Sequence, residues 1–136
     1  MKVSAFGAIF DDQGRILCVK RNYGDRTWTT PGGGIERGES PFQAAQREAY
    51  EETGYRVEVE HLIGVYCLPW MDDYVLFFRL RILGYDGWQP NAEIAEIGYF
   101  QQNALPQPMK VRTASRIHDA FDRIQGIVRV FSSDLG

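Results

Sequence analysis

Three glutamates close together in the sequence carry its clearest chemical signal. Glu48, Glu51 and Glu52 are three and four residues apart, so on an α-helix their carboxylates lie on one side, within roughly 6 Å of one another. Repulsion between exposed carboxylates costs only about 0.2–0.5 kcal/mol per pair, but partial shelter from water raises it to roughly 3 kcal/mol. A divalent cation would turn this repulsion into binding energy, and carboxylate oxygens suit Mg²⁺, Mn²⁺ or Ca²⁺. The spacing therefore indicates either a solvated acidic face or a metal site.

A helix over residues 41–53 is expected to carry these glutamates. Ser40 is the predicted N-cap and Pro41 the first helical residue, because proline has no amide hydrogen to lose there. Gln43 completes a capping box with Ser40, and Gly54 supplies a left-handed residue that ends the helix. The glutamates fall in the last turns, where the helix dipole disfavours negative charge.

The segment around this helix matches a known motif. Residues 33–55 read GGIERGESPFQAAQREAYEETGY. This segment resembles the Nudix box in every charged and glycine position, namely Gly33, Glu39, Arg47, Glu48, Glu51, Glu52 and Gly54. Ala49 and Tyr55 stand where Ile, Leu or Val is usual, and both can still pack in a core. The chain is therefore similar to Nudix hydrolases.

The resemblance implies a fold and an activity. The fold would be an α/β/α sandwich with a central mixed β-sheet, formed by residues 1–136 as a single domain. The activity would be metal-dependent cleavage of the diphosphate linkage in a nucleoside diphosphate joined to another group, such as ADP-ribose or a dinucleotide. One alternative is a MutT-like enzyme that converts nucleoside triphosphates to monophosphates and pyrophosphate. A non-catalytic nucleotide-sensing module is a more remote alternative, which a broken box would favour.

The resemblance also implies which residues bind metal. Glu48 and Glu52 are the expected direct ligands of Mg²⁺ or Mn²⁺. Glu51 would be a third ligand or a ligand to a second ion. The carbonyl oxygen of Gly32, in the glycine-rich loop before the helix, would complete the set.

Catalysis needs a proton acceptor and fixed side chains as well as a metal. Glu51 and Glu93 are the candidate general bases, and Glu93 corresponds to a downstream carboxylate that in some members of the family joins the metal site or acts as the base. Glu93 is equally compatible with an ordinary acid in a loop. Arg47 is expected to form a bidentate pair with Glu39 or another glutamate of the box and so to hold the acidic side chains in place.

Candidate substrate contacts lie just before the box. Arg21 and Arg26 either grip substrate phosphates or belong to a solvated loop. Gly33 allows the backbone to approach a ligand closely. A base or sugar would stack on an aromatic side chain. The candidates are Trp28, Tyr23, Tyr66 and Trp70, and each of them is also compatible with a packing role in the core or on the surface.

Composition limits the remaining possibilities. The 136 residues suit one domain, and 44% apolar with 24% charged residues is typical of a globular protein. A net charge of −3 argues against a nucleic-acid polymer as partner, and the resemblance implies a small nucleotide as substrate. The sequence contains no apolar run of ~18 residues and no leader-like N-terminus, so no membrane association is expected. Cys18 and Cys67 form no metal or disulfide motif and are expected to be reduced and buried in a cytoplasmic protein.

Hydrophobic patterning predicts the other elements. Strands are expected at residues 3–10, 16–20, 56–60, 62–68 and 74–83, with the first two forming a hairpin. A packing helix is predicted over 114–125, capped by Thr113 or Ser115 and stopped by Gly126. The apolar run 127–131 either covers a sheet edge or contributes to a homodimer.

Overall fold

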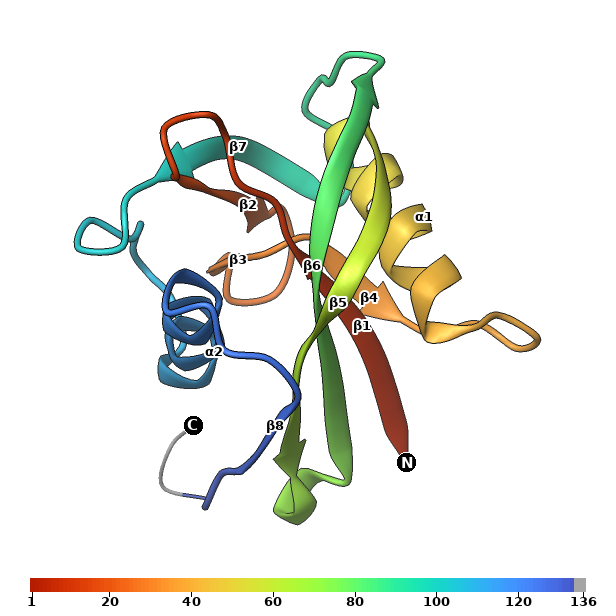
Figure 1. Ribbon diagram of the computed structural model, residues 1–136, viewed down its shortest axis with the longest axis vertical. Helices are drawn as coiled ribbons and strands as arrows, with labels where there is room; N and C mark the ends of the chain where they lie inside the picture. Colours follow the sequence, from red (N-terminus) through yellow and green to blue (C-terminus); the bar gives the residue numbers. More distant parts are fainter. Residues whose placement is uncertain (134–136) are drawn as a thin grey trace.

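The computed structural model describes residues 1–133 and contains a five-stranded mixed sheet at its centre (Figure 1). Its strand order is β4-β1-β6-β5-β8. The pairs β1–β6 and β5–β8 are parallel, and the pairs β1–β4 and β5–β6 are antiparallel. The predicted mixed sheet is therefore confirmed. Its strands are β1 (Lys2–Ala8), β4 (Gly32–Gly34), β5 (Tyr55–Leu68), β6 (Asp73–Tyr85) and β8 (Ile127–Val130).

A smaller antiparallel sheet has the order β3-β2-β7. The hairpin predicted from residues 3–10 and 16–20 exists only at its base, where Phe10 and Ile16 form an isolated bridge. Beyond this bridge the two strands separate into different sheets, because β1 already has β4 and β6 as its neighbours. The strands of the second sheet are β2 (Ile16–Arg21), β3 (Trp28–Thr29) and β7 (Ile94–Phe100).

The helix α1 (Pro41–Thr53) begins and ends as the sequence predicts. The Ser40 hydroxyl accepts a hydrogen bond from the Gln43 amide at 3.1 Å, and the Gln43 side chain accepts one from the Ser40 amide at 2.8 Å. Gly54 follows the helix with φ +78°. The buried face of α1 includes three small residues that let the helix lie close to the central sheet, namely Ala44, Ala45 and Ala49.

The helix α2 (Val111–Phe121) is shifted relative to the predicted range of 114–125. Lys110 is its N-cap and makes no side-chain capping bond, so neither Thr113 nor Ser115 caps the helix. The helix ends early because Arg123 takes a left-handed conformation (φ +59°), three residues before Gly126.

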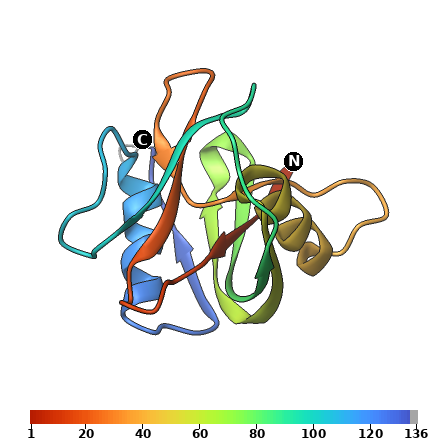
Figure 2. The same cartoon turned by 90° about the horizontal axis from the view of Figure 1, so that it is seen from above.

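The two helices lie on opposite sides of the central sheet (Figure 2). One buried cluster joins α2 to the sheet through Ile117 and Ala120, and a second joins α1 through its alanines. The α/β/α layering is thus confirmed, with the small sheet on the α2 side. A short 3₁₀ helix, η1 (Pro69–Met71), links β5 to β6.

Three further features complete the fold. β8 pairs with β5, so the run 127–131 covers a sheet edge. Both cysteines are free; Cys18 is buried, whereas Cys67 is only half-buried, contrary to expectation. No helix within residues 1–133 combines the length and apolar character needed to cross a membrane.

Candidate active site

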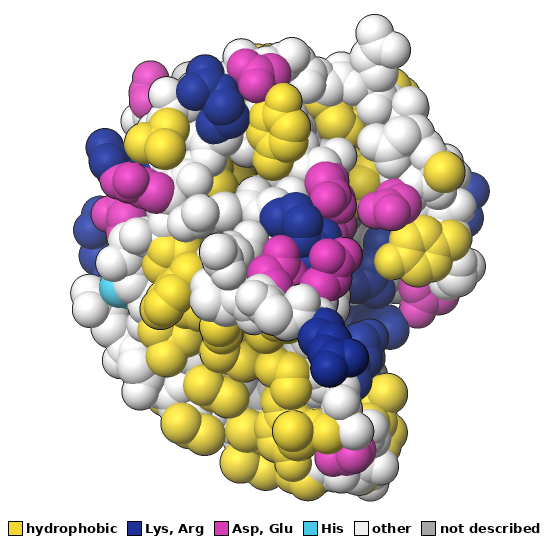
Figure 3. Space-filling view, turned by 90° about the vertical axis from the view of Figure 1, so that its right-hand side faces the viewer, with side chains coloured by type: hydrophobic (Ala, Val, Ile, Leu, Met, Phe, Trp, Pro, Cys, Tyr) yellow, Lys and Arg dark blue, Asp and Glu magenta, His cyan; other side chains and the backbone are white. Residues whose placement is uncertain are grey.

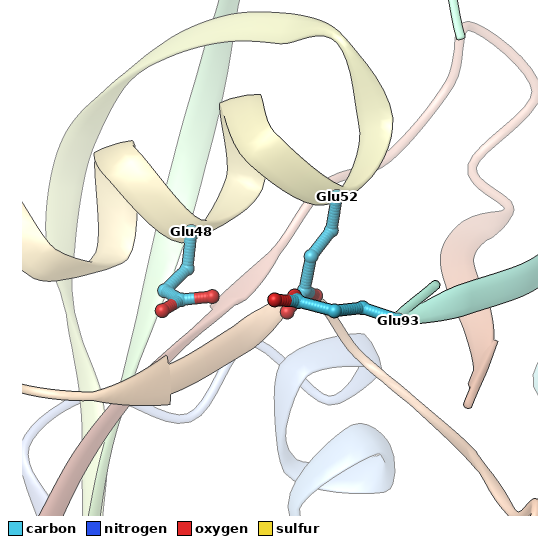
Figure 4. A group of neighbouring side chains, drawn as sticks. All are labelled: Glu48, Glu52 and Glu93. Carbon is cyan, nitrogen blue, oxygen red and sulfur yellow. The ribbon is translucent and has the colours of Figure 1, made fainter. Parts of the chain in front are cut away.

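Three carboxylates from two parts of the chain meet beside α1. One oxygen from each of Glu48, Glu52 and Glu93 lies within 4.8 Å of the other two (Figure 4). Glu48 and Glu52 are one turn apart on α1, and Glu93 comes from the loop before β7. Oxygen donors at this spacing suit a divalent cation.

Hydrogen bonds to the flanking loops hold Glu93 at this position. The Asn22 amide, just after β2, donates to the Glu93 carbonyl oxygen at 2.7 Å. The Asn91 side chain accepts hydrogen bonds from the amides of Glu93 and Ile94, both at 2.9 Å. The pairing of β2 with β7 thus carries a distant glutamate to the helix.

Glu52 is the most buried member of the cluster, with only 7% of its surface exposed. One of its oxygens accepts a hydrogen bond from the Gly32 amide at 3.1 Å. Burial, followed by the interaction with the neighbouring Glu48 carboxyl group, raises the pKa of Glu52 far above its usual range, although the Gly32 amide acts in the opposite direction. No ion pair to Glu52 is present within residues 1–133. A buried carboxyl without a countercharge is costly, and a cation in this position would remove that cost.

Arg47 connects the box glutamates. Its guanidinium makes the expected bidentate contact with Glu39, at 2.7 and 3.0 Å, and donates to Glu48 at 2.9 Å. A longer contact of 3.4 Å reaches Glu51, and one of 3.2 Å reaches the Gly34 carbonyl oxygen. The hydrogen bond from Arg47, helped by the Glu36 amide, lowers the pKa of Glu39 to about 2. Arg47 therefore holds the Glu48 carboxylate in place.

The glycines before the helix form the strand β4, whereas a loop was predicted. Pairing with β1 accounts for the difference, since Gly32 lies opposite Phe6 and Gly34 opposite Ser4. A Cβ atom on Gly33 would lie 2.7 Å from the Glu48 carboxyl group. Glycine at this position lets α1 approach the strand closely enough to place its carboxylates over it. The contact observed for Gly32 is its amide bond to Glu52, and a role for its carbonyl oxygen as a metal ligand stays a prediction.

Glu51 lies next to the cluster, outside the group of three carboxylates. Its side chain is 49% exposed. It lines an open depression of about 390 Å³ together with Asn91, Ala92 and Glu93. This depression offers room for a ligand next to the carboxylates.

The surface around α1 carries charges of both signs. Figure 3 shows acidic side chains gathered around a basic one on the α1 face, with further basic side chains beside them.

The structure places the predicted substrate-contact residues in three different settings: exposed on the surface, in a separate cavity, or buried in the core. Arg26 is exposed in a turn, with φ +54°, and Arg21 lines a separate basic cavity. Trp28 is a core residue that packs edge-to-face on Phe100 at 5.3 Å, so it offers no free ring face for stacking. Tyr66 is also buried in the core. Of the aromatic candidates, those that remain exposed are Tyr23 and Trp70.

The sequence interpretation missed the basic residues of α2, which was taken as a packing helix. Arg116 shares a buried helix face with Thr113, Ile117 and Ala120. The available signal was an arginine directly before Ile117, the first residue of the apolar stripe.

Comparisons with known proteins agree with this arrangement. A family model described as NUDIX domain matches residues 1–121. A MutT-like protein of Streptomyces ambofaciens is 33% identical over 120 residues, which cover 88% of this chain and 77% of the relative. A Bacillus subtilis protein, whose name proposes an 8-oxo-dGTP diphosphatase, is 35% identical over 116 residues, or 85% of this chain and 76% of the relative. The crystal structure of an ADP-ribose pyrophosphatase from Streptococcus suis superposes with a TM-score of 0.79 at 26% identity, covering 96% of this chain and 98% of that one. The chain is therefore a Nudix hydrolase, a member of the NUDIX domain family.

Proposed function

We propose that this protein uses a divalent cation to hydrolyse a phosphoanhydride bond in a small nucleotide. The observation that carries the proposal is the meeting of Glu48, Glu52 and Glu93, with Glu52 buried and without an ion-pair partner in the described part of the chain. The open depression beside Glu51 and Glu93 provides space for the diphosphate.

The residues present fit the proposed metal. Three carboxylate oxygens within 4.8 Å of one another form a hard donor set, which favours Mg²⁺ or Mn²⁺ over metals that prefer sulfur or nitrogen. Glu48, Glu52 and Glu93 would hold the ion. When bound, it would neutralise phosphate oxygens and lower the barrier to attack by water.

The side chains of the protein supply the other parts of the reaction. Glu51 and Glu93 both face the depression, so either can accept the proton of the attacking water. Arg47 keeps the Glu48 carboxylate in a single orientation, at 2.9 Å. The reaction adds water across the phosphoanhydride and releases two products that each carry a phosphate group.

Two substrate classes remain, each supported by a different finding. Our first candidate is a nucleoside diphosphate linked to another group, as in ADP-ribose or a dinucleotide, and the name of the Streptococcus suis neighbour supports it. The second is a nucleoside triphosphate, which the names of the MutT-like relatives support at higher sequence identity.

A product analysis over a nucleotide panel tests the proposed activity. We expect hydrolysis of at least one triphosphate, nucleoside diphosphate sugar or dinucleotide in Mg²⁺ or Mn²⁺, and none in EDTA. Pyrophosphate release from triphosphates alone would exclude the first substrate class. Equal turnover with and without chelator would contradict the metal-dependent chemistry.

Replacing Arg47 by lysine tests whether Arg47 orients the glutamate side chains of the Nudix box. Lysine keeps the charge but cannot make the bidentate contact with Glu39, so Glu48 becomes less well oriented. We expect metal affinity or turnover to fall about 10–100-fold, as is usual for residues that orient metal ligands. The measurement is activity as a function of Mg²⁺ concentration.

Arg56→Lys is the matched control, because Arg56 is an exposed arginine that pairs with Asp86 at 3.3 Å away from the cluster. It should retain normal metal dependence. If Arg47→Lys and Arg56→Lys behave alike, Arg47 has no special positioning role.

A further inference from the structure

A second cavity lies on the face of β1 and β6 that carries α2. It measures about 210 Å³. Among its described lining residues Asp73 is the single carboxylate, whereas five are basic: Lys2, Arg21, Lys110, Arg112 and Arg116. The lining is therefore strongly cationic in a protein whose net charge is −3.

Arg116 is buried at the inner end of this cavity, with 5% of its surface exposed. One terminal nitrogen donates to the hydroxyls of Thr29 and Thr30, at 2.8 and 3.3 Å. The guanidinium stacks over the rings of Phe6 and Phe77, at 4.5 and 5.4 Å. Its Nε atom is buried without a hydrogen-bond partner, and no carboxylate in residues 1–133 forms an ion pair with it. A buried guanidinium in this state is costly unless an anion accompanies it.

The other charges near Arg116 increase this cost. Desolvation, followed by repulsion from Arg21, lowers the pKa of Arg116. Asp73 does not compensate, because the strand register places it opposite Lys2, four residues from the Phe6–Phe77 pair. At 3.3 Å per residue this separation is roughly 13 Å along the strands. Within residues 1–133 the Arg116 guanidinium therefore has no ion-pair partner, and the one carboxylate of the lining lies several residues away along the strands.

β4 lies between Phe6, which lines the cavity, and Glu48 of the acidic cluster. A Cβ atom on Gly32 would point at the Phe6 ring, on the cavity side, whereas one on Gly33 would point at Glu48. The Gly32 amide meanwhile contacts Glu52. Neighbouring residues of one short strand therefore face a lining residue of the cavity and a member of the acidic cluster.

We propose that this cavity binds a phosphate group of the substrate other than the two joined by the cleaved bond. A phosphate supplies the missing countercharge and can accept hydrogen bonds from the free Nε of Arg116 and the neighbouring basic groups. A neutral nucleobase would leave the guanidinium uncompensated. The volume is below the roughly 300 Å³ of pockets that enclose a whole drug-sized ligand, so it suits one substituent.

Anion binding follows from the cavity alone, whereas the assignment of that anion to the substrate rests on the proposed function. The proposal favours nucleotides that carry at least one additional phosphate, such as triphosphates, over a nucleoside diphosphate joined to a neutral sugar. The proposal thereby gives a structural reason to prefer nucleoside triphosphates over nucleoside diphosphate sugars.

Binding can be tested in EDTA, where metal-dependent hydrolysis does not contribute. Inorganic phosphate, AMP and adenosine are added separately at constant ionic strength set with sodium chloride. The readouts are the melting temperature and the Nε–H resonance of Arg116 in ¹⁵N NMR spectra. We expect phosphate and AMP to raise the melting temperature and shift this resonance, and adenosine to do neither.

Two arginine variants test whether the response belongs to the cavity. Arg116→Met keeps the length of the side chain without its charge, and it should weaken phosphate binding by roughly tenfold or more. It should also melt at a higher temperature than the parent in phosphate-free buffer. Arg79→Met is the control, because Arg79 also stacks on an aromatic ring, that of Phe10 at 4.5 Å, but lies outside the cavity. It should keep the full phosphate response.

Arg112→Gln, at a half-buried position of the lining, provides a second test if Arg116→Met does not fold, and it should weaken phosphate binding in the same direction. An adenosine response as strong as that of AMP would assign the cavity to a base and overturn the proposal. An undiminished phosphate response in the Arg116→Met protein, or in Arg112→Gln where only that variant folds, would overturn it as well. Loss of all hydrolysis with intact phosphate binding would instead refute only the proposed function.

Discussion

Glu52→Gln is expected to remove most hydrolysis and to raise the melting temperature of the metal-free protein. Glu52 is 7% exposed and lies within 4.8 Å of two other carboxylates. Loss of a direct metal ligand should exceed the 10–100-fold effect of residues that only orient ligands. Because one unit of pKa displacement corresponds to about 1.4 kcal/mol, neutralising this buried group should stabilise the fold by about 1–2 kcal/mol.

The pH dependence provides an independent check of this effect. The folded-state pKa of Glu52 is raised above its ordinary value of 4.5, so the folded protein holds this proton where the unfolded chain has lost it. Its contribution to stability is therefore favourable at low pH and decreases as the pH rises from 4.5 through neutrality. In EDTA the difference in melting temperature between Glu52→Gln and the parent should grow over that range. Added Mg²⁺ should stabilise the parent more than the variant.

Two further variants complete the Glu52 experiment. Glu60→Gln removes an exposed carboxylate of β5 outside the cluster, and it should change neither activity nor the pH profile. Glu93→Gln should reduce turnover less than Glu52→Gln, and a larger loss would identify Glu93 as the general base. Unchanged turnover in Glu52→Gln would remove Glu52 from the active site.

Features set by local interactions were predictable from the sequence. The start and end of α1 depend on Ser40, Gln43 and Gly54, whose effects reach only a few residues along the chain. The bidentate contact between Arg47 and Glu39 was expected from the Nudix box and is present. In both cases the interacting residues are close in sequence, so spacing alone is informative.

Features set by competition between distant segments were not predictable. The prediction of a hairpin between β1 and β2 was wrong because β4 and β6 occupy both sides of β1. Nothing in the local sequence shows which strand gains that position. For the same reason the sequence left Trp28 as a candidate for either stacking or packing, and its contact with Phe100 places it in the core.

The basic cavity was also not predictable from the sequence, because it is formed by segments that are distant along the chain. Its floor combines β1 and β6 with Arg116 of α2, three elements that are far apart along the chain. The sequence showed an arginine next to an apolar stripe but not the aromatic rings that it covers. Glu93 is an intermediate case, since family resemblance suggested its role while the pairing of β2 with β7 brings it to α1.

Gly33→Ala is expected to disrupt catalysis while leaving the fold nearly intact. The new methyl group would lie 2.7 Å from the Glu48 carboxyl carbon and one of its oxygens, a separation that cannot persist. The backbone of β4 is held by its pairing with β1, so the flexible end of Glu48 must move instead. A displacement of about 1 Å in a catalytic group can cost about 100-fold in rate. We therefore expect turnover to fall by about this factor, with a higher Mg²⁺ requirement and a melting temperature near that of the parent.

The adjacent glycines of β4 provide controls for both parts of this prediction. A Cβ atom on Gly34 would meet no atom within 4 Å, so Gly34→Ala should retain activity. A Cβ atom on Gly32 would lie 2.6 Å from the Ala5 carbonyl oxygen, a backbone atom that cannot move aside, so Gly32→Ala should mainly destabilise the fold. Three alanine substitutions in one strand thus separate a catalytic effect, a neutral change and a loss of stability. If Gly33→Ala matches Gly34→Ala in turnover, the orientation of Glu48 does not limit the reaction.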